Sequence, residues 1–115
     1  MGVGDEIAPR FTQKPSLKQE DNGKRLVFTC ALEASPAPEI NWFRGTTPLQ
    51  ESDRIKMRVD NTSGNTFNVY MDITGVTQED GGSYKVVAKN KLGEMSASIN
   101  LNFNGKYVLI VKTHI

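Results

Sequence analysis

Apolar and polar residues alternate along most of the chain, in short runs that are separated by Gly, Pro and Asn. Because successive side chains of a β-strand point to opposite faces, each run predicts a strand with one buried face. Long runs with the spacing of an amphipathic helix are absent from the sequence. The pattern therefore predicts an all-β fold in which two antiparallel sheets pack face to face as a sandwich.

The first predicted strand, Ile7 to Phe11, is followed by a second piece, Leu17 to Glu20. Proline cannot donate a backbone hydrogen bond, so Pro9 and Pro15 indicate an edge position for both pieces. We expect the second piece to pair in parallel with the last predicted strand, around Ile99. The alternating apolar residues of the other predicted strands are Leu26, Phe28, Cys30 and Leu32; Ile40 and Trp42; Ile55, Met57 and Val59; Phe67, Val69, Met71 and Ile73; Tyr84, Val86 and Ala88; and Ala97, Ile99, Leu101 and Phe103.

Length and composition suit a single domain with one core, since 37% of the 115 residues are hydrophobic. Lys and Arg number 14 against 13 Asp and Glu, a net charge of +1, so bulk charge gives no reason to expect nucleic acid or an anionic membrane as a partner. No signal peptide or membrane span is recognisable. We predict a lead-in over residues 1–6, one domain over residues 7–103 and a C-terminal extension or linker over residues 104–115.

The tail after Phe103 contains a second apolar run, from Tyr107 to Val111. Asn104-Gly105 precedes it and is a typical turn dipeptide. Three interpretations remain open: the first strand of a following module, a non-native extension, or an added strand that folds back onto a sheet edge.

The most informative residues are a cysteine, a tryptophan and a tyrosine at fixed distances. Trp42 lies twelve positions after Cys30, and Asp80-Gly81-Gly82-Ser83-Tyr84 forms an Asp-x-Gly-x-Tyr corner. In an immunoglobulin-type sandwich the second bridging cysteine follows that tyrosine by two residues, and here the position is Val86. We predict that Cys30 and Val86 face each other across the core without a disulfide, which suits a reducing compartment.

The corner residues have structural interpretations. Tyr84 can bury its ring while its hydroxyl bonds the backbone a few residues upstream, and Gly82 allows a tight backbone. Asp80 would be a partly buried charge, for which Arg54 is the predicted partner. The alternative is that Asp80 accepts hydrogen bonds only from local backbone amides.

Residues suited to catalysis or metal binding are scarce. The single histidine, His114, lies at the end of the chain, and the single cysteine, Cys30, falls on a predicted inward face. A buried thiol is usually inert, and neither residue belongs to a cluster of metal ligands. We therefore expect no enzyme, no metal and no cofactor.

Several motifs are spread over the chain at fixed spacings: Pro9-Arg10-Phe11, Cys30, Pro38-x-x-x-Trp42, Arg54, Met71-x-Ile73-x-x-Val76, Asp80-x-Gly82-x-Tyr84 and Ala88-x-Asn90-x-x-Gly93. They resemble the intermediate set (I-set) immunoglobulin modules of giant sarcomeric proteins. Within that family, the segments Ala8 to Ser16 and Ala97 to Phe103 look most like modules of twitchin and projectin. The resemblance covers Ile7 to Phe103, and because such modules end near this Phe, it favours the first two interpretations of the tail. It implies a cytoplasmic protein of the thick-filament zone, the A-band of the sarcomere, with many such modules and a kinase domain elsewhere in the parent protein.

Two function classes follow from these observations. The first is a scaffolding module, monomeric and load-bearing in a tandem array, that contacts neighbouring immunoglobulin or fibronectin-type modules and thick-filament proteins such as myosin. The alternative is a ligand-recognition domain of an adhesion molecule or receptor. For the first class, outward parity predicts a protein-binding patch of Phe43 and Val87 flanked by Lys85 and Lys89, although single exposed apolar residues are also ordinary.

Overall fold

The computed structural model describes residues 6–104 and 107–114, which form nine strands and one short 3-10 helix. The elements are β1 (Ile7–Glu20), β2 (Arg25–Ser35), β3 (Glu39–Arg44), β4 (Thr47–Pro48), β5 (Ile55–Ser63), β6 (Thr66–Ile73), η1 (Gln78–Asp80), β7 (Gly82–Asn90), β8 (Gly93–Asn104) and β9 (Tyr107–His114).

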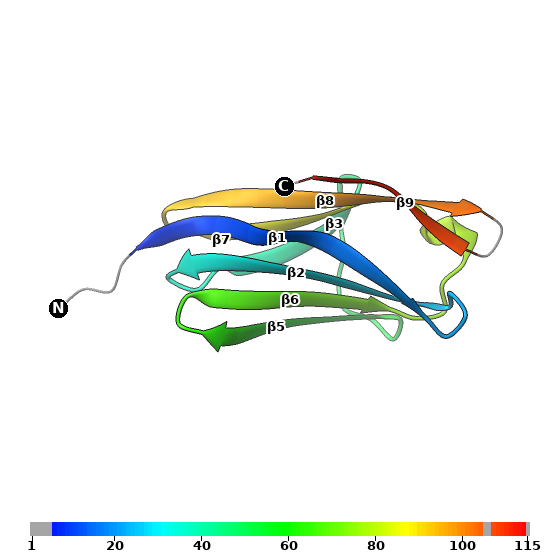
Figure 1. Cartoon of the computed structure of the whole chain (residues 1–115), viewed down its shortest axis with the longest axis horizontal. Coiled ribbons are helices and arrows are strands. Elements are labelled where there is room, and N and C mark those ends of the chain that lie inside the picture. Colours follow the sequence, from blue (N-terminus) through cyan, green and yellow to red (C-terminus); the bar gives the residue numbers. More distant parts are fainter. Residues whose placement is uncertain (1–5, 105–106, 115) are drawn as a thin grey trace.

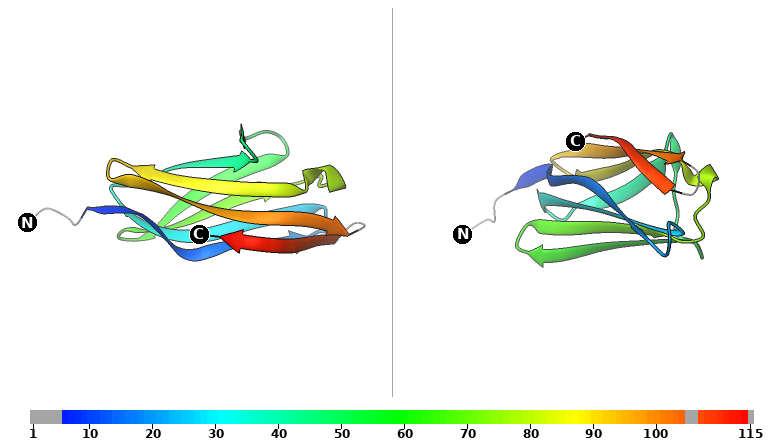
Figure 2. Two further views of the ribbon diagram at one scale, coloured as in Figure 1. Left: turned by 90° about the horizontal axis from the view of Figure 1, so that it is seen from above. Right: turned by 45° about the vertical axis from the view of Figure 1, so that its right-hand side comes forward.

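The strands form two antiparallel sheets, as the alternation predicts. One sheet has the order β1-β2-β6-β5 and the other the order β4-β3-β7-β8-β9. The sheets pack face to face as an elongated sandwich (Figures 1 and 2). All strand pairs within them are antiparallel, so the predicted all-β sandwich is confirmed.

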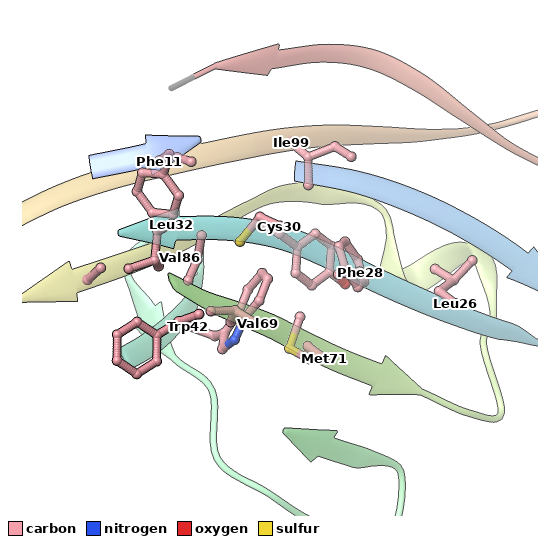
Figure 3. Packing of buried hydrophobic residues seen from close by; sticks show 14 of the residues in the cluster. Phe11, Leu26, Phe28, Cys30, Leu32, Trp42, Val69, Met71, Val86 and Ile99 are labelled. Carbon is pink, nitrogen blue, oxygen red and sulfur yellow. The ribbon is translucent and has the colours of Figure 1, made fainter. Parts of the chain in front are cut away.

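The core lies between the two sheets and is built from the inward residues of each strand. Phe28 is central, because its ring lies 5.9 Å from that of Trp42 and 5.0 Å from that of Tyr84. Full burial of each large apolar side chain contributes about 1.5 to 3 kcal/mol to folding. Cys30 and Val86 enter this core from opposite sheets with 2% and 0% of their surface exposed (Figure 3). The alternation therefore predicts the core well, except at Val59, which is 42% exposed in the middle of the edge strand β5.

The predicted division of the first strand is wrong. β1 runs without interruption from Ile7 to Glu20 and pairs antiparallel with β2. Its register shifts near Pro9 and Pro15, between Ile7 and Arg10 and between Gln13 and Ser16. A bulge in an edge strand accommodates a residue that cannot donate to the ladder, so the two prolines bend β1 without moving it to the other sheet.

The predicted parallel pairing of the Leu17 piece with the last strand of the domain is also wrong. Leu17 pairs with Phe28 of β2, and the free side of β8 is instead occupied by β9. The ladder between β8 and β9 extends from the pair Ser98 and His114 to the pair Asn104 and Tyr107. Of the three interpretations of the tail, the structure therefore agrees with the added strand that folds back onto a sheet edge. This strand, β9, also lies close to β1 (Figure 2).

Candidate protein-binding surface

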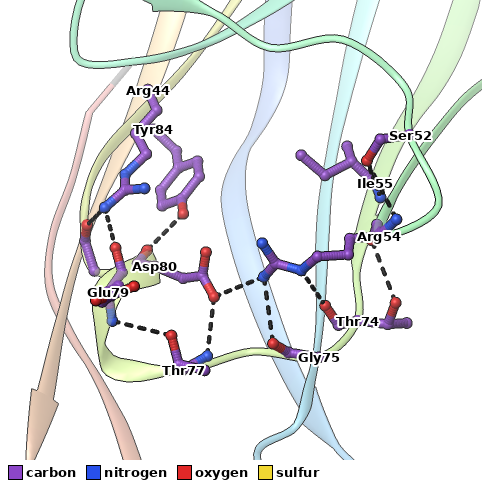
Figure 4. A network of polar contacts seen from close by, with 11 residues as sticks. Arg44, Ser52, Arg54, Ile55, Thr74, Gly75, Thr77, Glu79, Asp80 and Tyr84 are labelled. Atoms are coloured by element: carbon purple, nitrogen blue, oxygen red, sulfur yellow. Dashed lines mark hydrogen bonds and ion pairs between the residues drawn. The ribbon is translucent and has the colours of Figure 1, made fainter.

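The corner between β6 and β7 fixes one end of the sheet that carries the predicted patch (Figure 4). Thr77 caps η1: its hydroxyl accepts from the Glu79 amide at 3.3 Å, and its own amide donates to Asp80 Oδ2 at 2.9 Å. The same carboxylate oxygen accepts from Arg54 Nη2 at 2.8 Å. The predicted ion pair and the local backbone bond are therefore both present, and they share one oxygen of a side chain that is 12% exposed.

Tyr84 closes this corner from the core side. Its hydroxyl donates to the carbonyl oxygen of Asp80 at 2.5 Å. Burial raises the pKa of Tyr84, which favours the protonated hydroxyl that donates this bond. Gly82 has φ at +131°, a backbone conformation that side-chain-bearing residues rarely adopt. The structure thus places Asp80, Gly82 and Tyr84 in one unit, as the corner motif predicts.

Arg44 is a corner residue that the sequence analysis missed. It ends β3, and its Nη2 donates to the carbonyl oxygens of Glu79 and Gly81, the latter at 2.8 Å. Arg54 reaches the other side of the loop, where its Nε donates to the carbonyl oxygen of Thr74 at 3.0 Å. The sequence contained a hint of this role, because Arg44 lies two residues after Trp42 and so faces the same side of the strand. A charged side chain on that inward face can find polar partners only at the end of the sandwich.

Asn90 is a second residue that sequence reasoning missed, at the opposite end of β7. Its Nδ2 donates to the carbonyl oxygens of Ile7 at 2.8 Å and Pro36 at 3.1 Å, and its Oδ1 accepts from the Leu92 amide. It therefore joins the start of β1, the loop after β2 and the turn before β8. Its place in the Ala88-x-Asn90-x-x-Gly93 motif is the signal in the sequence.

The core residues offer no reactive group. Burial raises the pKa of the Cys30 thiol to about 12, which keeps it protonated and unreactive. Trp42 Nε1 is buried without a hydrogen-bond partner. Within residues 6–103, no three His, Cys, Asp or Glu side chains gather as metal ligands.

The predicted patch lies on the outer face of the five-stranded sheet, over β3 and β7. Phe43 is the cross-strand neighbour of Lys85, whose Nζ lies 5.2 Å from the centre of the Phe43 ring. Val87 is two residues further along β7 and diagonal to Phe43. Phe43, Lys85 and Val87 are each partly buried. The structure therefore brings these three residues together, with the lysine covering part of the aromatic ring.

Lys89 lies at the margin of this patch. It is exposed, and its cross-strand neighbours are Glu39 on β3 and Glu94 on β8. Two carboxylates beside the lysine weaken its positive potential. The patch therefore has an apolar centre with one cation, Lys85, in contact with it, and Lys89 contributes mainly at its edge.

The protein-family model of the immunoglobulin I-set domain matches residues 9–103 of the chain. The chain belongs to the immunoglobulin I-set family. Its fold is non-catalytic, so the domain itself is no enzyme. Within the part of the chain that the structure describes, no helix is long and apolar enough to cross a membrane.

The I-set relatives include both muscle proteins and a membrane protein. The chain is 36% identical over 89 residues to the titin homolog of Caenorhabditis elegans, a match that covers 77% of the chain and, to the nearest percent, 0% of the relative. It is 31% identical over 93 residues to the limbic system-associated membrane protein of Rattus norvegicus, with 81% of the chain and 26% of the relative covered. The chain thus spans a small part of these relatives.

A solved structure of the twitchin kinase region from C. elegans also matches. The TM-score is 0.68 at 30% identity, and the match covers 84% of this chain and 16% of that one. The resemblance to titin-like muscle proteins noted in the sequence is therefore confirmed at the level of the I-set module.

Proposed function

We propose that this chain is a scaffolding module of an intracellular sarcomeric protein, bearing load in a tandem array. The observation that carries this proposal is the buried pair of Cys30 and Val86, which closes the core between the sheets without a disulfide. A domain of this size that packs its core by apolar contacts alone is suited to a reducing compartment. The similarity to titin-like proteins supports a location in the sarcomere. By analogy with twitchin, we propose the A-band as the region of the sarcomere in which the module lies.

The proposed docking surface is the patch of Phe43, Lys85 and Val87, with Lys89 at its edge. An aromatic ring partly covered by a lysine presents apolar area and a cation together, which suits a partner surface with apolar and acidic groups. Thick-filament proteins such as myosin, or a neighbouring immunoglobulin or fibronectin-type module, are the proposed partners. The domain acts as a monomeric unit in this arrangement.

Co-sedimentation with purified muscle filaments tests the docking surface. The double variant Phe43→Ser, Val87→Ser should weaken binding, and Lys85→Glu should weaken it by removing the cation that lies over the Phe43 ring. A matched control is Val59→Ser, Leu92→Ser, which replaces two exposed apolar residues away from the patch. Equal binding by the patch variants and the control, with melting temperatures unchanged, would reject this surface.

The second function, ligand recognition by an adhesion molecule or receptor, is favoured by the similarity to the limbic system-associated membrane protein. Such a domain would use the loops at one end of the sandwich. The segments encoded on either side of this domain distinguish the two functions: further I-set or fibronectin-type modules support the scaffold, whereas a secretion signal or a membrane anchor supports the receptor.

A further inference from the structure

The four-stranded sheet has two edge strands of different character. These are β1 and β5, on opposite sides of the sheet (Figure 1). β1 contains two prolines and shifts its register beside them, which makes it a poor template for another strand. β5 contains no proline and pairs with β6 along nearly its whole length. The other side of β5 is therefore the edge at which this sheet can accept a further strand.

One hydrogen bond at the edge shows which backbone groups of β5 point away from β6. The Met57 amide donates to Glu51 Oε2 at 3.0 Å, from the loop that precedes β5. Because backbone groups of an antiparallel strand alternate between its two sides, those of Val59 and Asn61 also point to the free edge. Among the described residues, nothing bonds them on that side. The loop therefore covers the edge only as far as Met57.

Val59 lies at the centre of the open stretch. It is 42% exposed, although it has the inward parity of Met57, which packs against the core. A strand added beside β5 would cover it, because directly opposite side chains of an antiparallel pair lie about 4.5 to 5.5 Å apart. Beyond Asn61 the register with β6 shifts, and such a bulge bends an edge strand. The open stretch therefore extends from Met57 to Asn61.

The charges on either side of Val59 indicate which strand fits this edge. Arg58 Nε donates to Asp60 Oδ2 at 3.0 Å within the strand, and the two side chains are 64% and 45% exposed. A balanced pair of this kind attracts neither a strongly acidic nor a strongly basic segment. If β5 of a second copy pairs antiparallel about Val59, however, Arg58 of each copy stands directly opposite Asp60 of the other. The sequence around Val59 is therefore complementary to itself.

We propose that two copies of this chain pair through their β5 edges around Val59, so that the two four-stranded sheets become one continuous sheet. Val59 exchanges both backbone hydrogen bonds with Val59 of the second copy, and the Asn61 amide donates to the Met57 carbonyl oxygen across the interface. Glu51 keeps the Met57 amide. The contact is smaller than a standard interface, so the dimer is weak. Within one parent chain the module stays a single unit, and the edge joins two parent chains away from the Phe43 patch.

Analytical ultracentrifugation of the full chain, at concentrations up to about 1 mM, tests the proposal. Arg58→Asp and Asp60→Arg each place like charges opposite one another in the dimer, so each single variant should stay monomeric where the wild type dimerises. An equimolar mixture of the two variants should dimerise, because the acidic positions of one then face the basic positions of the other. The double variant Arg58→Asp, Asp60→Arg should dimerise by itself, like the wild type.

Val59→Pro tests the backbone part of the interface. The amide at this position points away from β6, so proline removes the hydrogen bond to the second copy and none within the sheet. Dimerisation should be lost. The controls are Lys14→Asp and Glu94→Arg, which make the same changes in net charge as the Arg58 and Asp60 variants at exposed positions away from β5. Each control should self-associate like the wild type, and melting curves check that every variant is folded.

Three results would overturn the proposal. The first is a wild type that stays monomeric over the whole concentration range. The second is a mixture of Arg58→Asp and Asp60→Arg that associates no more than either variant alone. The third is self-association that survives in folded Val59→Pro, which would place the contact at another edge. Filament binding through Phe43 should be unaffected by Arg58→Asp, which separates this proposal from the proposed docking surface.

Discussion

The thiol of Cys30 links the packing of one side chain to the alkaline stability of the fold. Its pKa is about 12 in the core, whereas a cysteine in an unfolded chain has a pKa of about 8.5. Above the lower value the unfolded chain loses this proton while the folded chain keeps it. The free energy of unfolding should therefore fall as pH rises from about 8.5 toward about 12, by at most about 1.4 kcal/mol per pH unit from this group.

Urea unfolding of the wild type and of Cys30→Val at pH values from about 8 to about 10.5 measures this contribution. The two proteins differ only at residue 30, so the difference in slope isolates the thiol. We expect the wild type to lose stability more steeply than the variant. An equal dependence of the free energy of unfolding on pH in the two proteins would show that the thiol is in contact with water in the folded state.

The ion pair of Arg54 and Asp80 is a second prediction at the residue scale. Asp80 is 12% exposed in its side chain and Arg54 is 48% exposed, so the coupling should exceed that of two exposed partners but fall short of a fully buried pair. A double-mutant cycle with Arg54→Met and Asp80→Asn should give a coupling of about 1 to 2 kcal/mol. Coupling near zero would mean that Asp80 acts only through the Thr77 amide.

Among the structural elements, β9 has the clearest testable role. It pairs with β8 between Ser98 and Asn104 and occupies an edge that would otherwise be open. Removal of residues 105–115 should lower the melting temperature, by about 4 to 8 °C for each kcal/mol lost. It should also increase self-association, because an open edge strand can pair with another copy. Differential scanning calorimetry and analytical ultracentrifugation measure both effects, and an unchanged monomer of equal stability would contradict them.

The sequence predicted the elements whose formation depends on side-chain alternation. Leu26, Phe28 and Cys30 face the core because a one-residue shift would expose all of them. The spacing of Cys30, Trp42 and Tyr84 predicted the pairing of the two sheets, and the Asp-x-Gly-x-Tyr motif predicted the corner.

Edge pairing was predicted poorly, because it depends on backbone hydrogen bonds that any residue except proline can make. The alternation in β1 does not say which neighbour it pairs with, and Pro15 suggested a break where the structure has a bulge. The apolar run of β9 left three interpretations open, and the family resemblance favoured the two that the structure does not have. Arg44 was missed for a related reason: its partners are the carbonyl oxygens of Glu79 and Gly81, and only the fold brings them beside the end of β3.

At the scale of the whole molecule, the sandwich presents two outer faces of different chemistry. One carries Phe43 and Lys85 over β3 and β7, and the other carries Lys56 and Arg58 on β5. The buried core separates the two faces, so substitutions on the β5 side should leave filament binding through Phe43 unchanged.

The reversal of the chain between β8 and β9 determines how the molecule would respond to stretching. β1 begins toward one end of the sandwich, whereas β9 returns along β8 and ends beside Ser98, part way along that strand (Figure 1). Tension applied at residues 6 and 114 would therefore peel β9 from its last pair onward, loading its hydrogen bonds one after another.

Unzipping of this kind needs little force, whereas shearing the remaining ladders breaks many bonds at once. Single-molecule pulling should show a short extension at low force, from the release of β9, before the main rupture. Removal of residues 105–115 should abolish the first event and leave the second. A single rupture in the full chain would mean that β9 and the sandwich yield together.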